Sequence, residues 1–297
     1  MQKGVEKMYL LQVMRKAPPR PKDVGTRHGR PRGRPQRTLA EFVDALQSSG
    51  SYVFDRRQVG AELGLTGLAL KRAVARLKAR GRLCAPRRGF YVVVPLEYRV
   101  AAAPPPTWFI DALMRHMGRP YYVGVLSAAA IHGAAHQQPQ EFQVVTDRPE
   151  RPLRAGRARI RFLIKERLDT SAVADVKTDT STMRVATPET TAFDLLRYQR
   201  AAGGLGNIAT VLAELAEHLD PRRLVLAAEA DGELARAQRL GHLLDRVGAR
   251  DRAGRLATWV ARRRPRLVLL RPGRPPARAS VDSRWQVVVN ERVGDDR

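Results

Sequence analysis

The sequence predicts an α+β protein with a small N-terminal domain of helices and a hairpin, residues 38–95, and a larger mixed α/β domain, residues 107–297. Three observations support this. Residues 38–94 carry three short helical patterns and then two β-rich runs, whereas strand-like and helical patterns are mixed beyond residue 107. Three consecutive prolines mark residues 96–106 as a stiff Pro-rich linker. The chain has 297 residues, 43% of them hydrophobic, so both domains can bury a core.

Basic charge is concentrated near the N-terminus. The formal net charge is +25, and residues 1–95 contribute 15 of these charges. This balance favours a polyanionic partner such as nucleic acid. The single cysteine, Cys84, excludes an intramolecular disulfide and a multi-cysteine zinc site. Because no stretch resembles a signal peptide or a membrane span, we expect a cytoplasmic protein without a membrane partner.

Residues 1–37 are expected to form a disordered basic arm. They carry 11 basic and 2 acidic side chains and, from residue 15 on, almost no apolar ones. The run Pro31-Arg32-Gly33-Arg34-Pro35 resembles the core of the AT-hook motif. In such a segment the glycine lets the backbone lie on the floor of a narrow minor groove, where Arg32 and Arg34 would meet its negative potential. The alternative is an arm that binds phosphates without reading the groove.

The elements of residues 38–95 have recognisable start and stop signals. Thr38 and Glu41 form a capping box, and Asp55 and Thr66 are N-caps of two further helices. Gly64 is free to take the positive φ that a sharp turn between helices requires. The expected elements are helices over 39–47, 56–63 and 67–80 and hairpin strands over 82–85 and 90–94. This order predicts a winged helix-turn-helix, with the hairpin as its wing.

The third of these helices has an apolar and a basic face. Its inward positions, three or four residues apart, are Leu70, Val74 and Leu77. On the outer face Arg72 and Arg76 are suited to bond guanine in the major groove, whereas Lys78 would meet phosphate. The alternatives are a plain solvated domain or a protein-interaction module. The candidate DNA-binding residues, including the arginines of the arm and of the hairpin tip, are Arg32, Arg34, Thr66, Ala69, Lys71, Arg72, Arg76, Lys78, Arg87 and Arg88.

The larger domain is expected to mix strands and helices throughout. Thr187 caps one helix and Pro188 occupies its first position. The expected helices cover residues 108–117, 126–132, 188–198, 207–219, 221–229, 233–247 and 251–261. The expected strands cover residues 121–123, 142–145, 159–164, 173–177, 183–185, 267–270 and 285–289.

Four runs of this domain, over residues 121–133, 138–146, 187–195 and 285–291, resemble the AbiEi-type antitoxin family. With the winged helix, the resemblance covers most of residues 38–297. It implies the antitoxin half of an abortive-infection, type IV toxin–antitoxin pair. It further implies a winged helix that represses the operon at inverted repeats in double-stranded DNA, and a C-terminal domain that counteracts a nucleotidyltransferase-like toxin. Direct contact with the toxin stays open, and a solitary regulator without a toxin is the alternative.

Two histidines and a glycine run could suggest chemistry in the larger domain. His132 and His136 are four residues apart, but Gly133 is expected to end the helix between them, so packing or turn roles are favoured over a zinc site. Ser127 has no ordered histidine partner. The run of residues 203–206 follows a helix and lacks a P-loop lysine, so we expect a turn.

The carboxylates of this domain have plain interpretations. Glu189 suits the first turn of its helix, and Asp194 is expected to be exposed or to cap locally. Glu166, Asp175 and Asp179 are scattered residues expected to lie in water. We therefore predict a non-enzymatic protein without cofactor, metal or catalytic residues. The alternative is a nuclease targeted to DNA by the winged helix.

Overall fold

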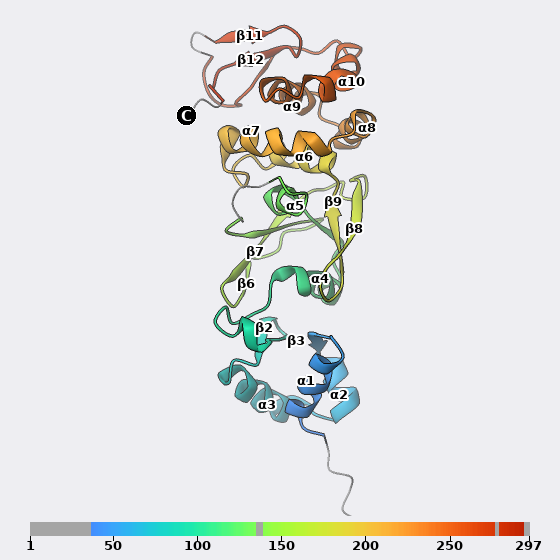
Figure 1. Cartoon of the computed structure of the whole chain (residues 1–297), viewed down its shortest axis with the longest axis vertical. Coiled ribbons are helices and arrows are strands. Elements are labelled where there is room, and N and C mark those ends of the chain that lie inside the picture. Colours follow the sequence, from blue (N-terminus) through green and yellow to red (C-terminus); the bar gives the residue numbers. More distant parts are fainter. Residues whose placement is uncertain (1–36, 135–138, 277–278, 294–297) are drawn as a thin grey trace, which may run out of the picture. The chain divides into compact units, whose positions relative to one another are not determined.

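The computed structural model describes residues 37–134, 139–276 and 279–293 (Figure 1). The basic arm with Arg32 and Arg34, and also His136, lie outside the described residues. Arg37 begins a compact unit that runs to the C-terminus. We refer to residues 38–95 as the winged-helix part and to residues 107–293 as the α/β part.

The winged-helix part contains three helices and a three-stranded antiparallel sheet of order β1-β3-β2. Phe42, Phe54 and Val59 lie in its hydrophobic core, and the rings of Phe42 and Phe54 meet edge to face. The elements are α1 (Leu39–Ser48), β1 (Val53–Asp55), α2 (Arg56–Leu63), α3 (Gly67–Ala79), β2 (Leu83–Arg87) and β3 (Phe90–Val93). This order agrees with the predicted winged helix-turn-helix, to which the structure adds the short strand β1.

The first two helices of this part start directly after their predicted N-cap residues, Thr38 and Asp55. The Thr38 hydroxyl accepts from the Glu41 N–H at 3.2 Å, and the Glu41 carboxylate accepts in return from the Thr38 N–H at 2.8 Å. Asp55 makes the equivalent box with Gln58 at the start of α2. Gly64 ends α2 with φ +62°. Thr66 is correctly placed before α3, but its hydroxyl caps no N–H of the described residues.

The expected linker, residues 96–106, is not an extended spacer. It contains the 3-10 helix η1 (Leu96–Tyr98) and leads into a second, η2 (Pro106–Trp108). Ala103 is buried, and the Arg157 N–H donates to the Ala101 carbonyl at 2.9 Å. Gly156 makes this approach possible, because a Cβ there would lie 2.1 Å from the Ala101 oxygen. The segment therefore packs on the α/β part.

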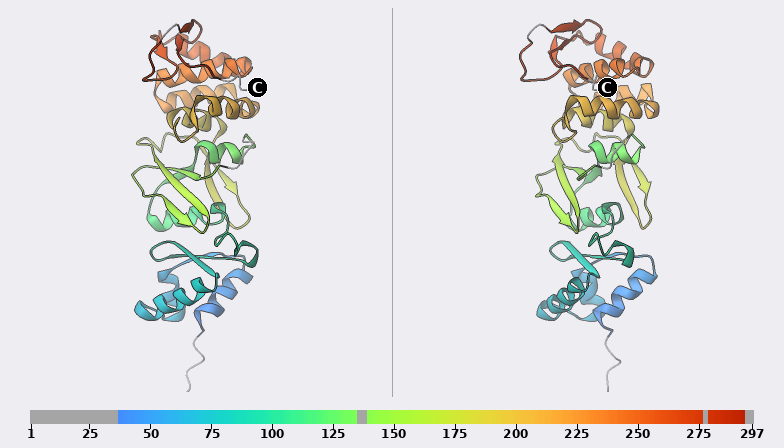
Figure 2. Two further views of the ribbon diagram at one scale, coloured as in Figure 1. Left: turned by 90° about the vertical axis from the view of Figure 1, so that its left-hand side faces the viewer. Right: turned by 60° about the vertical axis from the view of Figure 1, so that its left-hand side comes forward.

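A six-stranded mixed sheet of order β6-β7-β5-β4-β9-β8 forms the first half of the α/β part. Its strands are among the green to yellow segments of the ribbon in Figure 2. Pairs β4–β9 and β5–β7 are parallel, and the other neighbours are antiparallel. The strands are β4 (Tyr121–Val123), β5 (Phe142–Thr146), β6 (Leu153–Ala155), β7 (Ala158–Ile164), β8 (Val173–Lys177) and β9 (Thr182–Ala186). Two helices, α4 (Ile110–Met117) and α5 (Val125–Ile131), belong to this half. The sequence did not predict β6.

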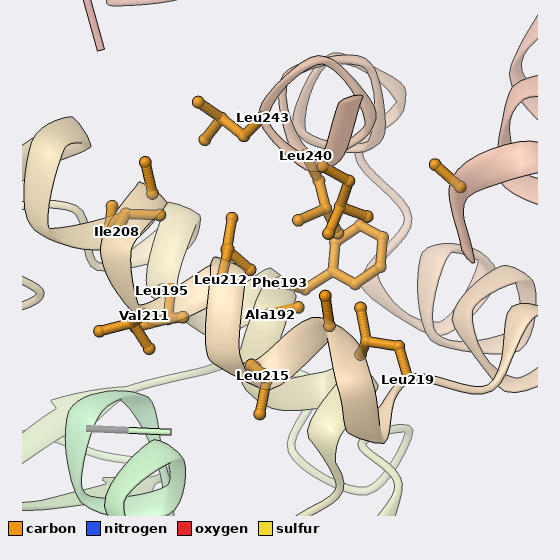
Figure 3. Packing of buried hydrophobic residues seen from close by; sticks show 14 of the residues in the cluster. Ala192, Phe193, Leu195, Ile208, Val211, Leu212, Leu215, Leu219, Leu240 and Leu243 are labelled. Atoms are coloured by element: carbon orange, nitrogen blue, oxygen red, sulfur yellow. The ribbon is translucent and has the colours of Figure 1, made fainter. Parts of the chain in front are cut away.

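Helices and a small sheet form the second half. Figure 3 shows Phe193, Leu212 and Leu240 in a core shared by α6, α7 and α9. The elements are α6 (Pro188–Arg197), α7 (Gly204–Leu215), η3 (Ala216–His218), α8 (Pro221–Asp231), α9 (Leu234–Arg246), α10 (Arg250–Ala261), β10 (Val268–Leu269), β11 (Ser280–Asp282) and β12 (Val287–Val289). The expectation of a turn over 203–206 is wrong beyond Gly203, because the next three residues begin α7. The sequence did not predict β11 either. No helix among the described residues is long and apolar enough to cross a membrane.

Candidate nucleic-acid interface

The two faces of α3 agree with the predicted periodicity. Leu70, Val74 and Leu77 are buried in the core of the winged-helix part. The side chains of the other face are exposed, and they are Thr66, Ala69, Lys71, Arg72, Arg76 and Lys78. A helix of about 10–12 Å diameter with such a face fits the major groove of B-form DNA, which is about 12 Å wide.

The tip of the wing is tighter than predicted. Arg87 still pairs with Phe90 in the sheet, so the turn consists of Arg88 and Gly89 alone, with Gly89 at φ +80°. Arg88 is exposed. The Arg87 guanidinium instead lies 2.8 Å from a carboxylate oxygen of Glu150 in the α/β part. The structure thus separates two arginines for which the sequence predicts the same role.

A groove of about 1380 Å³ opens between α2, α3, the turn of the wing and α4. Its basic side chains are Arg56, Arg57, Lys71, Arg88, Arg115 and His116. Asp55 also lines it, with a carboxylate that accepts the N–H groups of Arg57 and Gln58 at 2.7 and 2.9 Å. The sequence points to Lys71 and Arg88 but not to the other four, of which Arg56 and Arg57 form an adjacent basic pair at a helix start.

The α/β part contains a buried polar cluster at Tyr122, Lys165 and Asp194. The Tyr122 hydroxyl donates to Asp194 at 2.8 Å, and the Lys165 ammonium donates to its other carboxylate oxygen at 3.2 Å. The expectation of an exposed or capping Asp194 is therefore wrong, because this side chain is fully buried. Burial raises the pKa of the Asp194 carboxyl above its usual value, and the Lys165 charge opposes that shift. Burial, with Asp194 beside it, also raises the pKa of Tyr122.

Gly124 is needed beside this cluster. A Cβ at this position would lie 2.8 Å from a Val145 methyl group and 3.4 Å from an Asp194 oxygen. Tyr122, Lys165 and Asp194 are all buried, so this cluster offers no surface for a ligand.

Other polar residues singled out in the sequence also have structural partners. Glu189 is buried, and its carboxylate accepts from the Asp220 N–H at 2.9 Å, so its role is more than a favourable charge in a first helical turn. His132 Nε2 donates to the Ala186 carbonyl at 2.7 Å, in keeping with a packing role. The Ser127 hydroxyl accepts from the Gln143 N–H at 2.8 Å.

The scattered carboxylates lie at the surface, as predicted. Glu166, Asp175 and Asp179 are exposed, and Asp179 accepts from Trp108 Nε1 at 3.0 Å. Within the described ranges, no group of three or more His, Cys, Asp or Glu side chains is arranged to hold a metal ion.

Comparison with known proteins bears on the α/β part. Residues 122–246 match the family of the AbiEi antitoxin C-terminal domain. The α/β part carries an AbiEi-type domain. The match extends from β4 to the end of α9 and includes the buried cluster with Gly124. It confirms the predicted resemblance within these residues, whereas the winged helix and the run over 285–291 lie outside the match. The match also supports an antitoxin role in a toxin–antitoxin system.

A solved structure resembles the wider chain around the AbiEi-type domain. The crystal structure of the Rv2827c protein from Mycobacterium tuberculosis has a TM-score of 0.62 and 16% sequence identity to this chain. The similarity covers 84% of this chain and 90% of that one. At such identity the likeness concerns the fold alone, and it confirms the predicted α+β architecture. No curated protein matches the chain.

Proposed function

We propose that this protein is a DNA-binding transcriptional repressor and the antitoxin of a type IV toxin–antitoxin pair. The observation that carries the proposal is the exposed basic face of α3 in a chain that also carries an AbiEi-type domain. The protein is non-enzymatic and cytoplasmic, and its DNA partner is a double-stranded operator with inverted repeats in its own promoter.

In the proposed complex α3 lies in the major groove. Arg72 and Arg76 bond guanine O6 and N7 and read sequence, with Ala69 allowing close approach. Lys71, Lys78 and Arg88 contact phosphates and supply affinity without sequence information. We leave Arg87 out of this interface because Glu150 already binds its guanidinium. Thr66 lies exposed just before α3, where its hydroxyl can donate to a phosphate.

The antitoxin role belongs to the AbiEi-type domain. We propose that it counteracts a nucleotidyltransferase-like toxin encoded beside this chain. To test this, the neighbouring gene is induced alone and then together with the full chain. The expected result is growth arrest that the full chain relieves. A harmless neighbour, or arrest that the chain does not relieve, would overturn the antitoxin role.

The repressor role is tested on a reporter placed behind the DNA upstream of the chain's own coding sequence. The unaltered chain should lower expression, whereas Arg72→Ala together with Arg76→Ala should restore it and still relieve growth arrest. The proposal also requires binding without turnover. Duplex DNA incubated with the protein and Mg²⁺ should therefore remain intact, and its degradation would favour a nuclease.

A further inference from the structure

The groove beside the wing is shared by two parts of the chain. The winged-helix part contributes Arg56, Arg57, Lys71 and Arg88, and α4 of the α/β part contributes Arg115 and His116. Of the residues expected to contact DNA, Lys71 of α3 and Arg88 of the wing line this groove. The basic surface therefore continues from the expected DNA-binding elements onto α4.

Contacts on both sides fix α4 against the wing. His116 Nε2 donates to the Arg88 carbonyl at 3.3 Å, and the His116 ring lies 5.3 Å from the Phe90 ring between centroids. Glu150 binds Arg87 of the wing at 2.8 Å and Arg119, just beyond α4, at 3.1 Å. Arg115 thus has a defined place beside the turn of the wing and needs no large rearrangement to meet a ligand there.

Arg115 is available to an anion in this position. Its side chain is 74% exposed and forms an ion pair with Asp111, four residues earlier, at 2.6 Å. An ion pair between side chains four residues apart on a helix contributes little free energy, so the guanidinium can turn to a phosphate at small cost. Asp111 also accepts from the Tyr121 hydroxyl at 3.0 Å, which keeps a partner for this carboxylate when Arg115 turns away.

We propose that the DNA backbone bound by α3 and the wing crosses this groove, and that Arg115 of the α/β part binds one of its phosphates. The inference rests on the proposed DNA binding and extends it, because it makes α4 of the α/β part a direct part of the interface. DNA affinity then depends on both parts of the chain.

The test measures DNA affinity of the full chain as a function of salt. The probes are the duplex upstream of its own coding sequence and a random duplex of equal length. Each phosphate contact contributes about 0.9 to the slope of log K against log salt. We expect Arg115→Ala to reduce the slope by about one on both probes, and Arg115→Lys to preserve it. Between about 50 and 200 mM salt, the affinity of Arg115→Ala should change about threefold less than that of the unaltered chain.

A matched control is Arg274→Ala. This arginine is 53% exposed and also pairs with a carboxylate, Glu291, but it lies outside the groove. It should leave the slope unchanged. If the unaltered chain binds the duplex and Arg115→Ala has the same slope as the control, the inference is wrong while the proposed function stands. If the unaltered chain binds neither duplex, both are wrong.

Discussion

The guanidinium of Arg87 in the wing lies 2.8 Å from a carboxylate oxygen of Glu150 in the α/β part. The same carboxylate binds Arg119, and its side chain is only 10% exposed. In addition, Cys84, Phe90 and Val92 of the wing share a hydrophobic cluster with residues of the α/β part. Residues of the wing are therefore part of a hydrophobic core shared with the α/β part, and these contacts set the position of the wing relative to α4.

We expect Glu150→Gln to lower the free energy of unfolding by about 1–3 kcal/mol, because it weakens two charge-assisted hydrogen bonds at a largely buried position. Urea denaturation of the full chain measures the loss. The double variant with Arg87→Ala should lose less than the sum of the two single variants, since both remove the same interaction. Strictly additive losses would show that the pair does not couple the two parts.

The role of α3 is tested by replacing Arg72. Arg72→Ala should lower affinity for operator DNA by about 1–3 kcal/mol and affect random DNA much less, because a bidentate contact to guanine reads sequence. Lys78→Ala, by contrast, should weaken both duplexes to a similar extent. Competition binding at one fixed salt concentration separates the two. Equal losses on operator and random DNA for Arg72→Ala would contradict its assignment as a base-reading residue.

Local sequence signals predict most elements of the winged-helix part. The strand that they do not predict, β1, pairs with a strand far along the chain. The bounds of α2, residues 56–63, follow from Asp55 at one end and Gly64 at the other, so neighbours in sequence determine them. Strand β1 is three residues long and pairs with β3 far along the chain, so it leaves no clear local pattern. β6 and β11 are also only three residues long, but each pairs with the next strand along the chain, so their short length alone leaves too little pattern to predict them.

The candidate site divides in the same way. The exposed face of α3 follows from helical periodicity, which a single segment reveals. Arg115 lines the groove because α4 packs beside the wing. Arg87 is left out of the proposed DNA interface because its guanidinium pairs with Glu150. Asp194 is buried because Tyr122 and Lys165, 72 and 29 residues away in sequence, converge on it. The spacing of residues within a single helix or strand cannot predict these contacts, because they join different elements.

The buried cluster of the AbiEi-type domain gives a prediction for stability. Lys165→Met should lower the free energy of unfolding by about 3–5 kcal/mol, because it leaves the Asp194 carboxylate buried without its counter-charge. Adding Asp194→Leu should recover much of the loss, since the second change removes the stranded charge. Thermal and urea unfolding report both steps. A double variant no more stable than Lys165→Met would show that Asp194 is not a stranded charge in the single variant, and would contradict the prediction.

Gly241 in α9 allows the Trp285 indole to lie against the helix. A Cβ at Gly241 would approach three atoms of that ring to between 2.1 and 2.4 Å, and Trp285 is fully buried. Because the ring also donates to Asp245 at 2.8 Å, it cannot move away without losing a partner. Gly241→Ala should therefore cost about 1–3 kcal/mol or more, since overpacking outweighs the gain in helix propensity.

The matched control for that substitution is Gly254→Ala in α10, where an added Cβ meets no atom of the described residues within 4 Å. Alanine there should stabilise the chain by up to about 1 kcal/mol, because glycine is a poor helix former. Urea denaturation of both variants makes the comparison. Equal effects of the two substitutions would contradict the contact between Trp285 and α9, whereas a loss confined to Gly241→Ala would show that the Trp285 indole leaves no room for a Cβ on α9.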